Sequence, residues 1–183
     1  MNIEITKFKA AESQLITAID LYFRNGDPVS IHTLARSAHE VLDGLCKYRK
    51  LDRGIIEQGV AEFVKPEFKK MVFQKVSEAR NFFKHADKDP DGVLSWNSDV
   101  STYFIWDATS LYRRVNKGSM PCEILVFSAV FRVEHSELWT DKSPIDHLLK
   151  GGKEELRMID QSVVYETLLK ECRQDDFETV STI

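Results

Sequence analysis

The sequence predicts an all-α protein, built as a single helical bundle of about five to seven helices with short connections. Two observations predict this fold class. Apolar residues recur at helical spacing through most of the chain, and turn-forming residues interrupt that pattern at only a few places. The interruptions stand at residues 26–28, 87–92, 118–121 and 151–152, where glycine, proline and aspartate gather.

The first half of the chain divides into four predicted helices. A first helix is expected over residues 9–25, where a glycine follows and suits the C-terminal end. A second is expected to begin at Ser30, a favourable N-cap residue, and a short third helix to cover residues 55–63. A fourth begins at Pro66, which fits the first helical turn, and its apolar stripe continues to Phe83.

The second half adds three predicted helices. One covers residues 99–115, and another follows Pro121. Residues 124–133 are rich in β-branched and aromatic side chains, as a buried strand would be, but no partner strand is evident, so we expect a buried helix. A last helix is expected over residues 153–172, and the acidic residues 174–183 are expected to form a loose tail.

Length and charge limit the possible functions. A chain of 183 residues fits one domain, which we place at residues 1–173. The net charge of −4 argues against broad, non-specific binding of nucleic acid but leaves room for a local basic site. We expect no contact with a membrane, because no apolar run approaches the roughly 20 residues that span a bilayer. The N-terminus lacks the features of a secretory signal, so a cytoplasmic location is expected.

The chain has three cysteines, Cys46, Cys122 and Cys172, which are scattered and include no closely spaced pair. This pattern suggests neither a disulfide framework nor a zinc knuckle, and we expect three buried or half-buried thiols. No motif for a bound cofactor is found. A glycine-rich phosphate loop is missing as well.

The most informative feature is the hexapeptide RNFFKH at residues 80–85, near the end of the fourth predicted helix. On an ideal helix, Asn81 and His85 share one line on the polar flank, because residues four apart lie on the same face. Arg80 points about 140° away from His85 by the same geometry. A joint site therefore requires that the helix ends near His85 or that a second copy of the chain supplies the other half.

These residue types suit the cleavage of RNA. The substrate carries its own nucleophile, the 2′-hydroxyl group, and the imidazole of His85 can take or give that proton as general acid or base. Arg80 can hold the scissile phosphate with a forked pair of hydrogen bonds. Asn81 can orient either group. A reaction of this kind needs no metal.

An arginine, a polar residue and a histidine at this spacing resemble the signature of HEPN domains. Arg80 would match the arginine of that family, Asn81 the polar residue after it, and His85 the histidine. The resemblance implies an all-α fold over about residues 8–140, of the kind found in bacterial toxin, phage-defence and CRISPR-associated ribonucleases. It also implies a homodimer whose two motifs meet in one composite cleft, and a possible metal-independent endoribonuclease. Many domains of this family bind RNA or other proteins without cleaving anything.

An alternative reading of the chain stays open. The hexapeptide also fits an ordinary helix end, at which Arg80 faces solvent and His85 is favoured by the helix dipole. In that case the protein is a non-catalytic interaction module, which binds a protein partner through apolar and aromatic faces. The aromatic side chains at helical spacing, which fit core or interface packing, are Tyr103, Phe104, Trp106 and Tyr112.

Two further groups of polar residues were considered as cation sites. Asp87, Asp89 and Asp91 follow the layout of a calcium loop, but Ser98 stands where such a loop requires a glutamate, so a tight turn is the preferred interpretation. The second predicted helix carries His39 and Asp43 four residues apart with Glu40 between them.

His39 and Asp43 supply only two ligands, which make an incomplete metal site. We therefore expect a solvated helix face, in which Arg36 and Glu40 form a pair that supports the helix.

Overall fold

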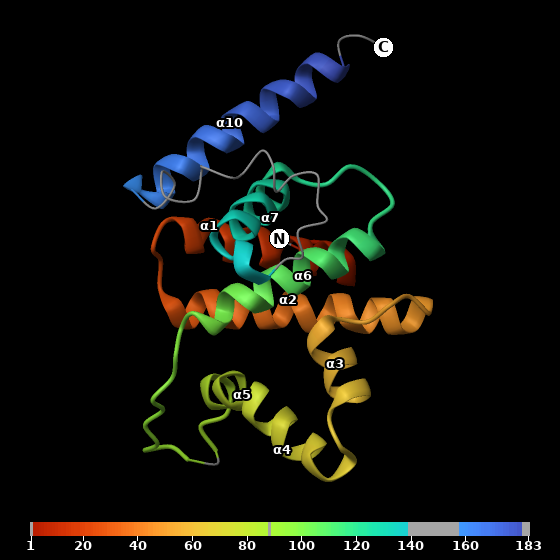
Figure 1. Cartoon of the computed structure of the whole chain (residues 1–183), viewed down its shortest axis with the longest axis vertical. Coiled ribbons are helices and arrows are strands. Elements are labelled where there is room, and N and C mark those ends of the chain that lie inside the picture. Colours follow the sequence, from red (N-terminus) through yellow and green to blue (C-terminus); the bar gives the residue numbers. More distant parts are fainter. Residues whose placement is uncertain (1, 88, 139–157, 181–183) are drawn as a thin grey trace.

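The computed structural model describes residues 2–87, 89–138 and 158–180 (Figure 1). These residues form eight α-helices and one short 3-10 turn and contain no strand, which confirms the prediction of an all-α fold. The elements are α1 (Lys7–Phe23), α2 (Pro28–Arg49), α3 (Ile55–Phe63), α4 (Pro66–Val76), α5 (Glu78–Lys84), α6 (Val100–Val115), α7 (Cys122–Glu134), η1 (Ser136–Leu138) and α10 (Gln161–Val180).

Helix α2 is the central element of the fold. It packs against α1 and α6, and α7 and α10 complete the bundle beyond α1. Helices α3, α4 and α5 lie on the other side of α2 and form a separate arm (Figure 1). The hydrophobic core lies between α1, α2, α6, α7 and α10, and its largest fully buried apolar side chains are Leu15, Ile19, Phe23, Leu42, Ile105, Leu111, Tyr112, Ile124, Phe127, Phe131 and Tyr165.

The first two helices begin at side-chain caps. Thr6 accepts a hydrogen bond from the backbone N–H of Lys9 at 3.1 Å, and Asp27 accepts one from that of Ser30 at 2.7 Å. The predicted cap at Ser30 was therefore wrong. Asp27 takes that role because Pro28 fits the first helical position, which lets the helix start two residues earlier than expected.

The fourth predicted helix is divided in two at Ser77, so the described residues contain two helices, α4 and α5, where the sequence predicted one. Ser77 has φ −101° and ψ 0°, so the helix axis changes direction there. The hydrogen bonds continue across the bend, from Ser77 to the carbonyl of Phe73 at 3.1 Å and from Asn81 to that of Ser77 at 2.9 Å. The bend turns α5 toward α2 and brings Ala79 into the protein interior.

The later helices occur where the sequence predicts them, but they begin or end at other residues. Helix α7 confirms the buried helix preferred for residues 124–133, and seven of its side chains are buried. Helix α10 begins at Gln161 and continues to Val180, past the expected domain boundary at residue 173. The start of the predicted last helix, at residues 153–157, lies outside the described part of the chain.

A disulfide joins Cys122 at the start of α7 to Cys172 in α10, with the two Cα atoms 5.8 Å apart. The expectation of three free thiols was therefore wrong, and only Cys46 is a free, buried cysteine. Sequence spacing could not reveal the pair, because the antiparallel packing of two distant helices brings the residues together. None of the helices in the described ranges combines the length and the apolar character needed to cross a bilayer.

Candidate functional site

The guanidinium group of Arg80 is held from two sides. The side-chain oxygen of Asn81 accepts hydrogen bonds from Arg80 Nε at 3.2 Å and from Nη2 at 2.9 Å. The third nitrogen, Nη1, binds the carboxylate of Glu40 on α2. The Arg80 side chain remains 27% exposed, so its position is fixed while part of it still reaches solvent.

His85 follows directly after the last residue of α5. Its backbone has left the helical conformation (φ −128°, ψ 92°), while its N–H still donates to the carbonyl of Asn81 at 3.1 Å. The side chain is 49% exposed, and Nδ1 lies 3.8 Å from the carboxylate of Asp87. Helix α5 thus ends next to His85, as a site formed by Arg80 and His85 of one copy would require. Within one copy, however, the contacts of Arg80 lead to α2, whereas those of His85 lead into the loop before α6.

The polar face of α2, formed by His32, Arg36, His39 and Asp43, is buried. The prediction of a solvated helix face was wrong for His39 and Asp43. The cause is contact with α6, through Asp107 and Phe104, and with the arm, through Glu57 and Arg53. Burial of ionisable groups is unfavourable unless each has a partner. The contacts of this polar face therefore explain how the arm is attached.

Arg36 and Glu40 form the predicted pair within α2, with Nη2 and Oε1 3.3 Å apart. Arg36 is only 3% exposed, and its guanidinium carbon lies 4.2 Å from the ring centroid of Phe104. The pair is thus part of the interior and not a surface support. Because Glu40 also binds Arg80, one carboxylate serves two arginines.

An aromatic pocket of about 340 Å³ lies between α2, α5 and α6. His32 meets Trp96 and Phe104 edge-on there, with ring centroids 5.1 and 5.5 Å away. The residues that line the pocket are His32, Lys75, Val76, Glu78, Ala79, Leu94, Ser95, Trp96, Val100 and Phe104.

Two nitrogen atoms of residues that line the aromatic pocket are buried without a hydrogen-bond partner among the described residues. They are Nε2 of His32 and Nε1 of Trp96. The other ring nitrogen of His32, Nδ1, lies 3.1 Å from the hydroxyl of Ser101. Burial and the nearby charge of Arg36 lower the pKa of His32 to about 4, so the ring is neutral at pH 7. A buried polar atom without a partner is unfavourable, which makes these nitrogens candidates for contact with a ligand.

A buried cluster of His39, Glu57 and Asp107 joins α2, α3 and α6. His39 Nε2 lies 2.9 Å from Asp107 Oδ2 and 3.5 Å from Glu57 Oε2. Asp107 also accepts hydrogen bonds from the backbone N–H groups of Ile55 at 3.0 Å and Ile56 at 3.3 Å, so it caps α3 from another helix.

The two carboxylates of this cluster differ in their environment. Burial opposes the ionisation of Asp107, but the hydrogen bonds from His39 and from the start of α3 outweigh it and lower the pKa of Asp107. Burial raises the pKa of Glu57, whose Oε2 has no hydrogen-bond donor.

Asp43 fastens the start of the arm in a similar way. Its carboxylate accepts hydrogen bonds from Arg53 Nε at 3.1 Å and from the backbone N–H of Gly54 at 3.0 Å. Asp43 is therefore a structural partner of the 51–54 connection. The metal ligands that His39 could share are instead Glu57 and Asp107, which lie far away in the sequence.

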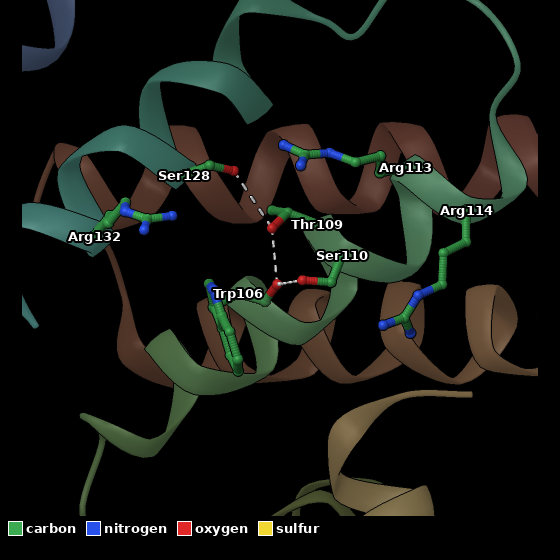
Figure 2. A pocket seen from close by; sticks show the side chains of 7 residues that line it. All are labelled: Trp106, Thr109, Ser110, Arg113, Arg114, Ser128 and Arg132. Atoms are coloured by element: carbon green, nitrogen blue, oxygen red, sulfur yellow. Dashed lines mark hydrogen bonds between the residues drawn. The ribbon is translucent and has the colours of Figure 1, made fainter. Parts of the chain in front are cut away.

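Another pocket, which is polar and has a volume of about 300 Å³, lies between α6 and α7 and is lined by three arginines (Figure 2). Its hydroxyl groups are engaged within the protein, since Thr109 and Ser110 both donate to the carbonyl of Trp106, at 2.7 and 3.3 Å. Arg114 donates to the carbonyl of Arg53 at 2.8 Å. This pocket is consequently less suited to a ligand than the aromatic pocket.

The acidic loop forms the tight turn preferred from the sequence. The N–H of Gly92 donates to the carbonyl of Asp89 at 3.2 Å, and the carboxylate of Asp89 packs against Gly92. Of the aromatic residues expected in the core, Phe104 and Tyr112 are buried, whereas Tyr103 is 41% exposed.

Sequence reasoning missed Glu57, Trp96 and Asp107. One available signal was the spacing of the polar residues of α2 at positions 32, 36, 39 and 43, which form a stripe on one helix face. A stripe that contains two histidines and no lysine could have indicated a helix face that other elements cover.

Comparisons with known protein families, with curated proteins and with solved structures find no match to this chain.

Proposed function

We propose that this chain is a HEPN-like helical protein that binds RNA and cleaves it with metal-independent acid–base chemistry at the end of α5. The observation that carries the proposal is the double hydrogen bond by which Asn81 holds Arg80, just before the helix ends at His85. In this proposal Arg80 binds the scissile phosphate and Asn81 orients the guanidinium group. His85 acts as the general acid or base.

Local charge supports the binding of a phosphate. Arg36 and Arg80 both bind the carboxylate of Glu40, so Arg80 shares its acidic partner with a second arginine. Arg36 is buried, whereas Arg80 reaches solvent, so an incoming anion would meet Arg80. A guanidinium group already held in place loses little freedom when it binds a phosphate.

The aromatic pocket supports the recognition of a nucleobase beside the phosphate. It adjoins α5, since Glu78 and Ala79 line it, and its aromatic rings suit a planar ligand. The unpaired Nε1–H of Trp96 can donate to a base carbonyl, and Nε2 of neutral His32 offers a second polar contact. Unpaired bases of single-stranded RNA can enter such a pocket, whereas stacked bases of a duplex cannot.

A second copy of the chain would complete the site. Arg80 and His85 have divergent contacts within one copy, and helix α4 beside them has no buried side chain. Its apolar residues Phe68 and Met71 are 49% and 54% exposed, and Phe63 before it is 84% exposed. A two-fold contact through these side chains would bury them and join the arms of two copies.

The same exposed face favours a second candidate function, a non-catalytic module that binds another protein through α4. In that case RNA would be neither bound nor cleaved. Sedimentation separates the two possibilities, because the catalytic proposal requires a dimer of the chain alone. A cytoplasmic location and a bacterial setting are part of the first proposal.

The test is cleavage of a labelled single-stranded RNA in the presence of EDTA. We expect cleavage by the wild-type protein, and a loss of about 100-fold or more in His85→Ala, as for removal of a general acid or base. Arg80→Ala should lose both cleavage and binding. Lys47→Ala is the matched control, because this exposed cation lies toward the far end of α2 from the Arg36 contact. Cleavage that is absent, or equal in the wild type and His85→Ala, would contradict the catalytic proposal.

A further inference from the structure

We infer that His39, Glu57 and Asp107 form a binding site for a divalent transition-metal ion, with Zn²⁺ as the best match to their one nitrogen and two oxygen donors. The three residues come from α2, α3 and α6, so a bound ion would fasten the arm to the bundle. This inference is independent of the proposed action on RNA, which uses other residues and no metal.

The spacing of the donor atoms fits such an ion. Zinc binds histidine nitrogen and carboxylate oxygen at about 2.0–2.2 Å, so ligand atoms around a tetrahedral ion lie about 3.4 Å from one another. In the cluster, His39 Nε2 is 3.5 Å from Glu57 Oε2 and 2.9 Å from Asp107 Oδ2. All three donor atoms lie within 4.8 Å of one another. An opening of about half an ångström between His39 and Asp107 would bring this pair to the tetrahedral spacing.

The cluster belongs to a larger set of polar contacts between the arm and the bundle. This set contains four carboxylates and three guanidinium groups. The carboxylates belong to Glu40, Asp43, Glu57 and Asp107, and the guanidinium groups to Arg36, Arg53 and Arg80.

Among the described residues, no guanidinium group forms an ion pair with Glu57. Arg53 is occupied by Asp43, and Arg36 and Arg80 both bind Glu40. The Oε2 atom of Glu57 is buried and has no hydrogen-bond donor, although it lies beside His39. An isolated buried carboxylate is strongly unfavourable, and a metal ion between the two carboxylates would remove that penalty.

The role of Asp107 as a helix cap does not account for this arrangement. Capping α3 requires Asp107 alone, and His39 can support that cap through one hydrogen bond. Nothing in the cap requires a second buried carboxylate against the same histidine nitrogen. A metal site explains why Glu57, in the first turn of α3, faces inward.

Gly54 keeps the space in front of the three donor atoms open. Its backbone (φ −56°, ψ 149°) is one that any residue adopts, so conformational freedom does not explain the glycine. A Cβ atom at this position would lie 2.7 Å from Asp107 Oδ2 and 3.1 Å from both Glu57 Oε2 and His39 Nε2. The absence of a side chain thus preserves a small volume that all three donor atoms face.

The test is a titration of the full chain, without an affinity tag, after removal of metal by dialysis. We expect one Zn²⁺ per chain by elemental analysis and a saturable signal in calorimetry. Glu57→Gln keeps the shape of the side chain and the cap at Asp107, and it should lower the affinity at least about tenfold. Glu62→Gln, an exposed position on the same helix, is the matched control and should bind as the wild type does.

Two further measurements make the outcome independent of folding defects. Zn²⁺ should raise the melting temperature of the wild type but not of Glu57→Gln, because only a protein that binds the ion in its folded state is stabilised. Substitution with Co²⁺ should give a spectrum without a thiolate band, which excludes Cys46 as the ligand. A wild type that binds no Zn²⁺, a Glu57→Gln variant with unchanged affinity, or a thiolate band would each overturn the inference.

Discussion

The side-chain oxygen of Asn81 accepts two hydrogen bonds from Arg80, from Nε at 3.2 Å and from Nη2 at 2.9 Å. These neighbours in sequence therefore act as one unit, in which the amide fixes the plane of the guanidinium group. Glu40 holds the remaining nitrogen. The sequence left open whether Asn81 would orient Arg80 or His85, and its side-chain hydrogen bonds go to Arg80.

The first prediction concerns this unit. Asn81→Ala should leave the charge of Arg80 in place but free its orientation, so RNA cleavage should fall by about 10- to 100-fold while RNA binding changes little. The measurement is the cleavage rate at saturating RNA together with the dissociation constant. Asn97→Ala, in the loop before α6, serves as the control. A variant that loses binding and not the cleavage rate would assign Asn81 to direct contact with RNA.

The second prediction concerns pH and His32. In the unfolded chain a histidine has a pKa of about 6.5, whereas burial lowers that of His32 in the folded protein to about 4. As the pH falls, the unfolded chain therefore takes up a proton at this histidine before the folded protein does. The free energy of unfolding that is present above pH 6.5 decreases as the pH falls toward 4. Between pH 7.5 and 5.5 the loss from this residue should be about 1 kcal/mol.

Urea denaturation at the two pH values checks the prediction for His32. The variant His32→Gln should show a smaller drop in the free energy of unfolding than the wild type. The variant His85→Gln, which changes an exposed histidine, should keep the full drop. Equal drops in the wild type and His32→Gln would show that His32 already binds its proton in the folded state near pH 6.5.

The third prediction concerns the attachment of the arm. Asp43→Ala removes the acceptor for Arg53 and for the backbone N–H of Gly54, and it leaves a buried donor without a partner. We expect a loss of about 2 kcal/mol in the free energy of unfolding, measured in urea with EDTA present. Hydrogen exchange should accelerate in α3 more than in α1. Asp52→Ala changes an exposed neighbour and should have an effect within about 0.5 kcal/mol.

The fourth prediction concerns the disulfide between Cys122 and Cys172. It closes a segment with a sequence separation of 50 residues. In the chain-entropy account, a cross-link of this length stabilises a protein by about 4 kcal/mol. Dithiothreitol should therefore lower the melting temperature of the wild type and have no effect on Cys122→Ser. The variant Cys46→Ala should respond to dithiothreitol as the wild type does, since Cys46 takes no part in the bond.

The sequence predicted the helices well because apolar periodicity and turn residues are local signals. The helix at Ile55–Phe63 and the inward side of α7 follow from such signals. The bend at Ser77 was missed, because the apolar stripe runs through it and only the packing of α5 on α2 makes it favourable. The cysteine pair was missed for a similar reason, since it depends on how two distant helices pack.

The candidate sites were predictable only in part. Arg80, Asn81 and His85 are close in sequence, so they could be named together from the sequence, but the ideal helix used to place them ends before His85. The partners of His39 come from α3 and α6, and no spacing rule connects Glu57 with Asp107. The burial of this cluster depends on an arm whose position is set by tertiary contacts.

The most direct test of the central claim is a mixture of Arg80→Ala and His85→Ala. Each variant alone should be inactive on RNA. In a composite site built by two copies, each mixed dimer holds one intact pairing of Arg80 with His85, so an equal mixture should recover about a quarter of the wild-type rate. We expect this recovery. A mixture as inactive as the separate variants, from proteins shown to form mixed dimers, would contradict it.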